Sequence, residues 1–358
     1  MNSPLVLGIE TSCDDTACAL VDGAGRVLSS VVSSQLAAHR PYGGVVPEIA
    51  SREHLTNWSA VSREALERAG VSLDDVDVVA ATRGPGLVGA LLVGLSLGKA
   101  IAFAKKRPFH AVHHLEGHLF SPFLRAPGDP AVPSAPPSRF VGLVVSGGHT
   151  SLFAVEDGAV STLGETRDDA MGEVFDKVGK RLGLPYPQGP RVDELAERGT
   201  PGARPLPISR FEGLDFSYSG LKSQALLEIE RLERTLGPID LAADGDGEHE
   251  PPQEVLDLLA GFRASAVGQV LARLDRLHQR EQHQSIGTLA VSGGVAANRL
   301  LRRELPVWAE RNGVDLRLVP LVYSGDNAAM IAHAALLRHR RGTADDLFTA
   351  EAASRIPI

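Results

Sequence analysis

The chain has 358 residues, of which 43% are hydrophobic and 22% charged, so its composition is that of a globular protein long enough for two domains. It carries 44 acidic and 36 basic side chains and a net charge of -8, which excludes a uniformly basic surface but not local basic patches. The opening residues MNSPLVLGIE enter a strand pattern without the parts of a secretory signal, which predicts a cytoplasmic protein.

Residues 4–35 read as three short strands separated by tight turns. Cys13 and Cys18 in this segment form neither a CxxC motif nor a disulfide framework, so we expect reduced thiols. A strand ending in a glycine-rich turn follows at 77–86, and then the apolar run LVGALLVGLSLG at 87–98. That run is too short and too rich in glycine to span a membrane, which predicts a buried helix and no membrane association.

The segment VHHLEGHLF at 112–120 places His114 and His118 four residues apart, so on a helix both imidazoles lie on one face. Such a pair can hold a metal ion. However, the HExxH motif of zinc proteases requires a glutamate where this chain has Leu115, and Gly117 weakens a helix. These residues alone are compatible with a metal site or with two structural histidines.

The pattern of the first half recurs in the second half. Residues 139–166 again read as three strands, and a later strand ends in a glycine-rich turn at 288–299. The proline-rich stretch 125–138 reads as a linker, and the aperiodic acidic stretch 236–254 as a solvated insertion. We therefore expect an α/β fold with two duplicated lobes around a central cleft: residues 1–124, completed by a C-terminal helix at about 325–345, and residues 139–324.

Three segments end a strand in small residues: GIETS, VVSGGHT and AVSGGVAANR. Glycine lets the backbone approach phosphate closely, and free N–H groups in such turns favour anions. Neither a GxxxxGK[ST] loop nor a Rossmann fingerprint is present. Duplicated lobes with phosphate-binding hairpins are instead typical of actin-like ATPases and sugar kinases, which predicts a nucleotide site in the cleft.

Carboxylates near these turns are further candidates. Asp14 and Asp15 lie on the first hairpin, and Asp176 lies in a helical segment where it can be a functional group or merely an exposed, lysine-paired residue. Asp326 precedes an alanine-rich helix and can serve as its N-cap. Because two histidines and one carboxylate suit a catalytic divalent metal, Asp326 is also a candidate third ligand beside His114 and His118.

Nine ordered segments, covering nearly the whole chain, resemble the bacterial tRNA N6-adenosine threonylcarbamoyltransferases of the TsaD/Kae1/YgjD family: LGIETSCDDT, YGGVVPEIASREH, GPGLVGALLVG, HHLEGH, LVVSGGHT, DDAMGEVFDKVGKRLGL, FSYSGLKSQ, VSGGVAANR and GDNAAMIA. The resemblance implies transfer of threonylcarbamoyl from threonylcarbamoyl-AMP to N6 of the adenosine 3′-adjacent to the anticodon (position 37) in tRNAs reading ANN codons. AMP is the product that leaves.

Carried over by position, the resemblance makes His114, His118 and Asp326 the ligands of one divalent metal, iron before zinc, and Asp14 a catalytic residue. It implies an adenine-nucleotide site in the cleft formed by Val144, Val145, Ser146, Gly147, Gly148, Asp176, Gly189, Asp193 and Asn298. It also implies three macromolecular partners: tRNA, an inactive TsaB-like paralogue that pairs through the first lobe, and a small TsaE-like ATPase.

Two positions depart from the family pattern. Gln188 stands where the family usually has glycine, so a side chain is expected beside the ligand, and Asp15 is one methylene shorter than the usual glutamate. For tRNA, the candidate basic clusters are KVGK with Arg181, NRLLRR at 298–303, and Arg338 with Arg340 and Arg341, each of which can also be a solvated helix face.

Rival functions are a small-molecule kinase or ATPase of the same architecture, a metallopeptidase and a non-catalytic scaffold paralogue. The kinase would produce ADP rather than AMP, the peptidase lacks HExxH, and the scaffold should have lost the three metal-ligand positions that this chain retains.

Overall fold

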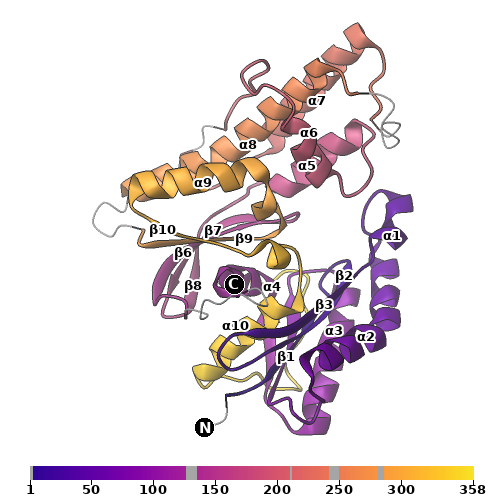
Figure 1. Cartoon of the computed structure of the whole chain (residues 1–358), viewed down its shortest axis with the longest axis vertical. Coiled ribbons are helices and arrows are strands. Elements are labelled where there is room, and N and C mark those ends of the chain that lie inside the picture. The colour runs from indigo at the N-terminus through magenta and orange to yellow at the C-terminus, as the bar shows by residue number, and fades with distance from the viewer. Residues whose placement is uncertain (1–2, 126–134, 210–211, 242–249, 281–285) are drawn as a thin grey trace. The chain divides into compact units, whose positions relative to one another are not determined.

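The computed structural model describes residues 3–125, 135–209, 212–241, 250–280 and 286–358, and these form two compact units. Unit 1 comprises Met1–Pro137 and Leu318–Ile358, and unit 2 comprises Ser138–Arg317 (Figure 1). The C-terminal segment therefore returns to the unit that contains the N-terminus. The lobe boundaries expected from the sequence stay a prediction, and residues 126–134 of the expected linker lie outside the described residues.

Unit 1 is built on a five-stranded sheet in the order β3-β2-β1-β4-β5. The first three strands are antiparallel neighbours, whereas β4 runs parallel to β1 and β5 parallel to β4. Every residue of β1 and β5 is buried, as expected for strands covered on both faces. The strands are β1 (Val6–Glu10), β2 (Asp15–Val21), β3 (Val27–Ser34), β4 (Val78–Gly84) and β5 (Phe109–His113).

The helices of unit 1 come from the first 120 residues, except for one that comes from the C-terminal segment. Its α-helices are α1 (Leu36–His39), α2 (Pro47–Ala69), α3 (Val88–Lys105), α4 (His114–Phe120) and α10 (Ala328–Arg340), with short 3-10 turns at Arg40–Tyr42, Ser121–Phe123 and Leu321–Tyr323. Helix α10 lies directly on β1, because a Cβ atom on Gly8 would be only 2.8 Å from the Ala332 nitrogen. The glycine in β1 thus permits a close helix–sheet approach.

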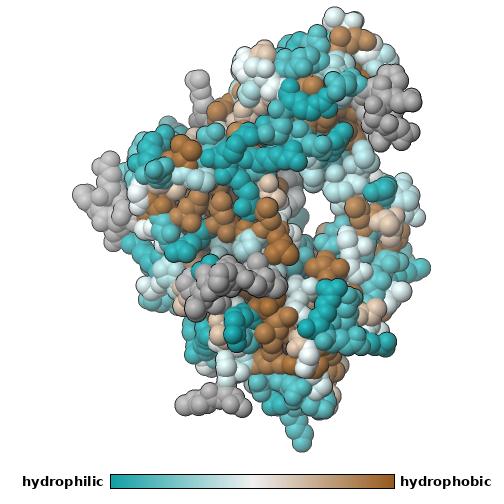
Figure 2. Space-filling view, viewed as in Figure 1, coloured by the Kyte–Doolittle hydropathy of each residue, from teal (hydrophilic) through white to brown (hydrophobic). Residues whose placement is uncertain are grey.

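The expectation of a buried helix for the apolar run at 87–98 is wrong in part. Only one face of α3 is buried, while Val88, Leu92 and Phe103 are 45%, 49% and 67% exposed. Hydrophobic side chains reach the surface of both units between hydrophilic ones (Figure 2). By length and composition, α3 and one helix of unit 2, Gln253–Arg280, could each cross a membrane; 33% and 72% of their apolar windows are buried. The core helix of a globular unit passes the same test.

Unit 2 repeats the topology of unit 1, which confirms the duplication seen in the sequence. Its sheet has the order β10-β9-β6-β7-β8, with β6, β7 and β8 antiparallel neighbours and β9 parallel to β6. The strands are β6 (Arg139–Val145), β7 (Thr150–Glu156), β8 (Ala159–Glu165), β9 (Thr288–Ser292) and β10 (Asp315–Leu318), and the helices are α5 (Met171–Arg181), α6 (Gln188–Ala196), α7 (Ser219–Leu236), α8 (Gln253–Arg280) and α9 (Arg299–Asn312), with a 3-10 turn at Gly294–Ala297.

The acidic stretch at 236–254 is not a solvated insertion along its whole length. Ile239 and Leu241 are buried, and the Leu241 amide donates to the carbonyl of Leu182 at 2.7 Å. Helix α8 already begins at Gln253. Only the middle of the stretch, residues 242–249, lies outside the described residues. The two hydrophobic residues anchor the chain after α7, which the charge pattern of the segment concealed.

Unit 1 also buries two neutral histidines. Both ring nitrogens of His110 and of His333 are buried and have no hydrogen-bond partner among the described residues. Burial lowers the pKa of each imidazole to about 4; for His333 the positive charge of Arg340 adds to this effect. The folded state therefore holds both rings neutral.

These lowered pKa values predict acid sensitivity. Their stabilising contribution is present above the ordinary histidine pKa and is lost as the pH falls toward 4, because the unfolded chain then binds protons more tightly than the folded one. In His333→Leu, the free energy of unfolding should fall less between pH 7 and pH 4 than in the wild type, by about 2 kcal/mol. Urea unfolding at several pH values measures the difference. Parallel pH curves would contradict the prediction.

Candidate functional site

The two histidines that the sequence singled out lie on the short helix α4, directly after β5. His113 ends the strand and caps the helix, since its Nδ1 accepts the Leu115 amide at 3.1 Å. His114 is the first residue of α4, and His118 follows one turn later. Gly117 between them faces α10, and a Cβ there would lie 2.9 Å from Cδ1 of Ile331. The glycine thus weakens the helix but lets α10 approach it.

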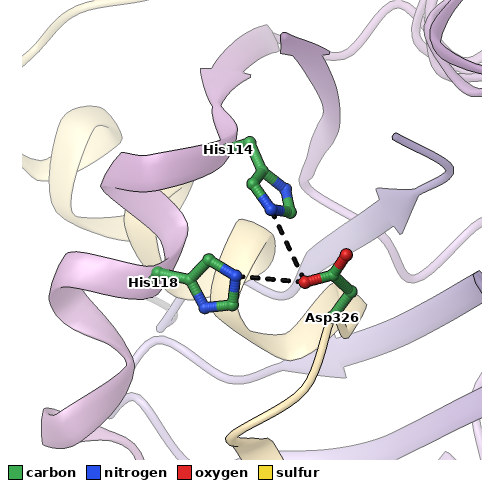
Figure 3. A group of neighbouring side chains, drawn as sticks. All are labelled: His114, His118 and Asp326. Carbon is green, nitrogen blue, oxygen red and sulfur yellow. Dashed lines mark hydrogen bonds and ion pairs between the residues drawn. The ribbon is translucent and has the colours of Figure 1, made fainter. Parts of the chain in front are cut away.

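Asp326 comes from the segment before α10. It does not serve as the N-cap of that helix, because Asn327 takes that place and accepts the Met330 amide at 3.0 Å. Its Oδ1 instead lies 3.1 Å from Nε2 of His118 and 3.5 Å from Nε2 of His114 (Figure 3). The three ligand atoms all lie within 4.8 Å of one another. The structure thus brings together the three candidate ligands within unit 1.

The chemistry of this group fits a divalent cation. Both histidines are buried, whereas the Asp326 side chain is 27% exposed, so the group has an open side. Burial alone lowers the pKa of His114, but the charges of Asp326 and Glu10 raise it to about 9. The imidazole therefore lies in a strongly negative environment, where a cation can replace its proton. Two imidazoles and one carboxylate form a donor set suited to a metal with further open coordination positions.

The predicted catalytic residue Asp14 lies on the hairpin between β1 and β2, and its carbonyl accepts the Gln35 amide at 2.9 Å. Its neighbour Asp15 is largely buried. Burial first, and then the negative charges of Asp326 and Asp14, raise the pKa of the Asp15 carboxyl to about 7. The hairpin thus adds acidic groups to the electrostatic environment of the His–His–Asp group.

Unit 2 contains a pocket of about 400 Å³. Five of the nine predicted nucleotide-binding residues line it: Gly147, Asp176, Gly189, Asp193 and Asn298. The other four, Val144, Val145, Ser146 and Gly148, are not among its lining residues. The lining is completed by Gly172, Phe175, Pro187, Pro190, Gly294, Val295, Ala297 and Arg299, which sequence reasoning did not select. Most of these are close in sequence to selected residues.

Glycines bring the backbone segments around this pocket together. A Cβ on Gly172, in the first turn of α5, would lie 2.7 Å from the carbonyl oxygen of Ser146. Gly293 has a φ of 92°, and a Cβ there would lie 2.7 Å from the carbonyl carbon of Val145. The VVSGG turn is therefore in direct contact with α5 and with the second glycine-rich turn. At Gly147, by contrast, a Cβ would meet nothing within 4 Å.

Two carboxylates, Asp176 and Asp193, are among the polar groups that line the pocket. Asp176 is not an exposed, lysine-paired residue: its Oδ1 accepts the Gly189 amide at 2.7 Å, and burial raises its pKa. Asp193 accepts the side-chain amide of Asn298 at 2.6 Å and the backbone amide of Arg299 at 3.1 Å. Both carboxylates thus also fix the backbone turns that line the pocket.

Arg263 on α8 is a further residue of this network that the sequence did not reveal. Its side chain is buried, and its guanidinium donates to Oδ1 of Asp193 at 3.1 Å and to the Asp193 carbonyl at 3.0 Å. It also pairs with Glu197. Arg263 lies in a long helix that carries no recognisable motif, so only the tertiary contact identifies it.

Gln188 does not enter the pocket, contrary to our expectation. It is the first residue of α6, it is buried, and its side chain packs against Gly179 of α5, where a Cβ would lie 3.2 Å from Cγ of Gln188. It is not among the residues that line the pocket. The glycine at 179 provides the room for the larger side chain.

Some of the basic side chains expected to contact tRNA form ion pairs within the chain. Arg303 forms two hydrogen bonds to Glu197, at 2.6 and 3.0 Å, and Arg338 is mostly buried. The observed ion pairs are Arg303–Glu197, Arg181–Glu233, Lys177–Asp169 and Arg338–Glu116. These side chains offer less net positive charge than the sequence suggested.

The family model described as tRNA N6-adenosine threonylcarbamoyltransferase (TsaD) matches residues 26–333. The chain belongs to this family. A curated relative with this name from Pelobacter propionicus is 50% identical over 331 residues, which cover 92% of this chain and 90% of that protein. One from Burkholderia thailandensis is 46% identical over 340 residues, covering 94% and 93%. As a member of this family the chain is a transferase of tRNA modification, which confirms the resemblance.

Solved structures show the same architecture at low sequence identity. Component A of the (R)-2-hydroxyglutaryl-CoA dehydratase of Acidaminococcus fermentans aligns with a TM-score of 0.51 at 16% identity, covering 95% of this chain and 99% of that one. HypF from T. kodakarensis aligns with a TM-score of 0.58 at 14% identity, covering 95% and 48%. These likenesses bear on the fold alone, and they confirm the actin-like ATPase and sugar-kinase architecture.

If the triad holds a metal, removing both imidazoles should abolish binding. We expect about one divalent ion per chain in the wild type and nearly none in His114→Ala with His118→Ala. Elemental analysis after dialysis against a metal-containing buffer measures the content. His339→Ala, which removes a histidine of the same unit outside the triad, is the control and should retain the ion. Full occupancy of the double variant would disprove the assignment.

The pocket predicts different effects of valine at two adjacent glycines. A side chain at either Gly147 or Gly148 meets no atom of the protein within 4 Å, but only Gly147 lines the pocket. Gly147→Val should therefore weaken AMP binding by roughly tenfold or more, while Gly148→Val changes it little. Calorimetry measures both affinities. Wild-type affinity for AMP in Gly147→Val would place the nucleotide elsewhere.

Proposed function

We propose that the chain transfers threonylcarbamoyl from threonylcarbamoyl-AMP to N6 of the adenosine at position 37 of tRNAs that read ANN codons, with release of AMP. The observation that supports this most directly is that a chain of this family retains both a convergent His–His–Asp group and a glycine-lined pocket with two carboxylates. The first provides a metal site and the second a nucleotide site.

In this proposal His114, His118 and Asp326 hold one divalent cation, iron by family resemblance and zinc as the alternative. The cation supplies Lewis acidity that stabilises negative charge on the reacting carbonyl or on the phosphate. The partly exposed Asp326 leaves an open side for the ligand. The buried histidines keep water away from the other side of the group.

The adenylate binds in the pocket of unit 2. Gly147 and Gly189 allow the ligand to approach the backbone closely, and backbone N–H groups in such turns favour a phosphate. Asp176 and Asp193 each keep acceptor capacity beyond their protein contacts, which suits the hydroxyl groups of a ribose. Asn298, held by Asp193, presents a further polar group at the pocket wall.

The carbamoyl carbon of the substrate is already activated as a mixed anhydride, so the chain mainly has to orient the amine and favour the departure of AMP. A covalent thiol intermediate is not part of the proposal. Burial and then the charge of Asp14 raise the pKa of the Cys13 thiol, which keeps it protonated and poorly nucleophilic. We assign Asp14 a catalytic role on this acidic hairpin.

We further propose that the chain works in the cytoplasm with tRNA, a TsaB-like inactive paralogue and a small TsaE-like ATPase. The exposed apolar side chains of α3, Val88, Leu92 and Phe103, give unit 1 a surface that suits a protein partner. Because Arg181 and Arg303 of the candidate basic clusters are paired internally, a partner can contribute part of the tRNA-binding surface.

Reconstitution tests the activity. The chain and its partners, incubated with threonylcarbamoyl-AMP, ATP and unmodified tRNA, should produce threonylcarbamoyladenosine, detected by mass spectrometry of the nucleosides, together with AMP. Asp14→Asn should lower the rate by about tenfold or more, whereas Asp22→Asn, in the next turn of the same sheet, should have little effect. Absence of modified tRNA in this mixture, together with formation of ADP by the chain alone, would favour a small-molecule kinase or ATPase instead.

A further inference from the structure

We propose that Glu10 is a positioning residue that fixes the orientation and the tautomer of His114, so that Nε2 of this imidazole faces the cation. The inference rests on the proposed metal site and adds a residue to it. Glu10 is the last residue of β1 and is completely buried, at 0% exposure. A buried carboxylate requires several hydrogen-bond donors, and the donors around Glu10 identify its role.

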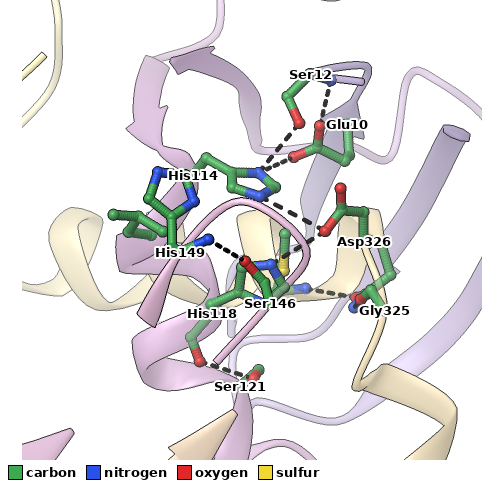
Figure 4. A network of polar contacts seen from close by, with 12 residues as sticks. Glu10, Ser12, His114, His118, Ser121, Ser146, His149, Gly325 and Asp326 are labelled. Atoms are coloured by element: carbon green, nitrogen blue, oxygen red, sulfur yellow. Dashed lines mark hydrogen bonds and ion pairs between the residues drawn. The ribbon is translucent and has the colours of Figure 1, made fainter. Parts of the chain in front are cut away.

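Glu10 has three partners. Its Oε2 accepts from the hydroxyl of Thr82 at 2.6 Å and lies 3.1 Å from Nδ1 of His114. Its Oε1 accepts the backbone amide of Ser12 at 2.5 Å. Figure 4 shows Glu10 and Ser12 on one side of the His114 ring and Asp326 on the other. The imidazole is thus held between two acidic groups, each facing a different ring nitrogen.

An ionised carboxylate only accepts hydrogen bonds, so Nδ1 of His114 must carry the hydrogen in this contact. The hydroxyl of Ser12, 3.2 Å from the same Nδ1, offers a second acceptor for that hydrogen. In the neutral imidazole the lone pair is then on Nε2, which lies 3.5 Å from Oδ1 of Asp326. The ring is therefore prepared to donate that lone pair to a cation between the two side chains.

His118 provides the contrast. Its Nε2 also faces Asp326, at 3.1 Å, but its Nδ1 is buried and has no hydrogen-bond partner in the part of the chain that the structure describes. Of the two histidines, only His114 has a carboxylate at its Nδ1 among the described residues. Carboxylates that accept from the second nitrogen of a metal-binding histidine fix its tautomer, and their removal typically lowers metal affinity ten- to a hundredfold.

A purely structural role for Glu10 makes a different prediction. Through Thr82 the carboxylate joins β1 to the neighbouring strand β4, so its loss could destabilise the sheet without any effect on the metal. Metal affinity of the folded protein separates the two roles. The structure offers two controls: Thr82, which shares Oε2 of Glu10 but does not contact His114, and Glu116, a buried glutamate on α4 that pairs with Arg338.

The experiment measures Zn²⁺ and Co²⁺ affinity of the full chain by chelator competition, with folding checked by circular dichroism. Glu10→Leu, which has no acceptor, should bind both ions about ten- to a hundredfold more weakly, and Glu10→Gln, which keeps an amide oxygen, should lose less. The visible spectrum of bound Co²⁺ should also change in Glu10→Leu. Thr82→Val and Glu116→Gln should stay within about threefold of the wild type.

Unchanged affinity in folded Glu10→Leu would overturn the inference, and so would equal losses in Thr82→Val and Glu116→Gln. If Glu10→Leu does not fold, the metal affinity of Glu10→Gln is compared with that of Thr82→Val. Equal affinities of these two variants would overturn the inference. Failure of the underlying metal site has a separate signature: the wild type binds neither ion, or His114→Ala binds as tightly as the wild type.

Discussion

The close approach of α10 to β1 and α4 is the contact on which the arrangement of unit 1 depends. Two glycines permit it, Gly8 in the central strand and Gly117 between the two histidines, since side chains at these positions would clash with α10. The facing surface of α10 is small as well, because its alanines are buried. As a result Asp326 reaches His118, which is 208 residues away in the chain. A bulkier interface would move the carboxylate away from the histidines.

Glycines also permit close packing in unit 2, where they bring three backbone segments together around a pocket. Gly172 contacts the VVSGG turn, and Gly293 contacts Val145 at the end of strand β6, which leads into this turn. Because these contacts involve glycines, backbone segments lie at the pocket beside the polar side chains of Asp176, Asp193, Asn298 and Arg299. The duplicated units thus differ in the residues at their strand ends: in unit 1 a His–His–Asp group gathers beside α4, whereas in unit 2 glycine-rich turns after β6 and β9 line a pocket.

Each of these two places contains a buried charged side chain. Glu10 lies beneath the histidine pair, and Arg263 lies beneath Asp193, each with almost no solvent exposure. Burying such groups is unfavourable unless several hydrogen bonds compensate, and both have them. An apolar core would have been simpler to stabilise, so the networks are best understood as supports that hold the functional side chains in one geometry.

Sequence alone determined the fold class, the duplication, the family and the candidate metal ligands, because these depend on strand and helix patterns and on motifs of adjacent residues. The spacing of His114 and His118 predicted one helical face, Asp326 was a candidate third ligand from its residue type, and the family resemblance selected it. Tertiary structure decided what depends on long-range contacts: that Asn327 rather than Asp326 caps α10, that Gln188 packs away from the pocket, and that half of α3 is exposed. Glu10 and Arg263 were invisible in the sequence, because a carboxylate or guanidinium acquires its role only from partners brought to it by distant segments.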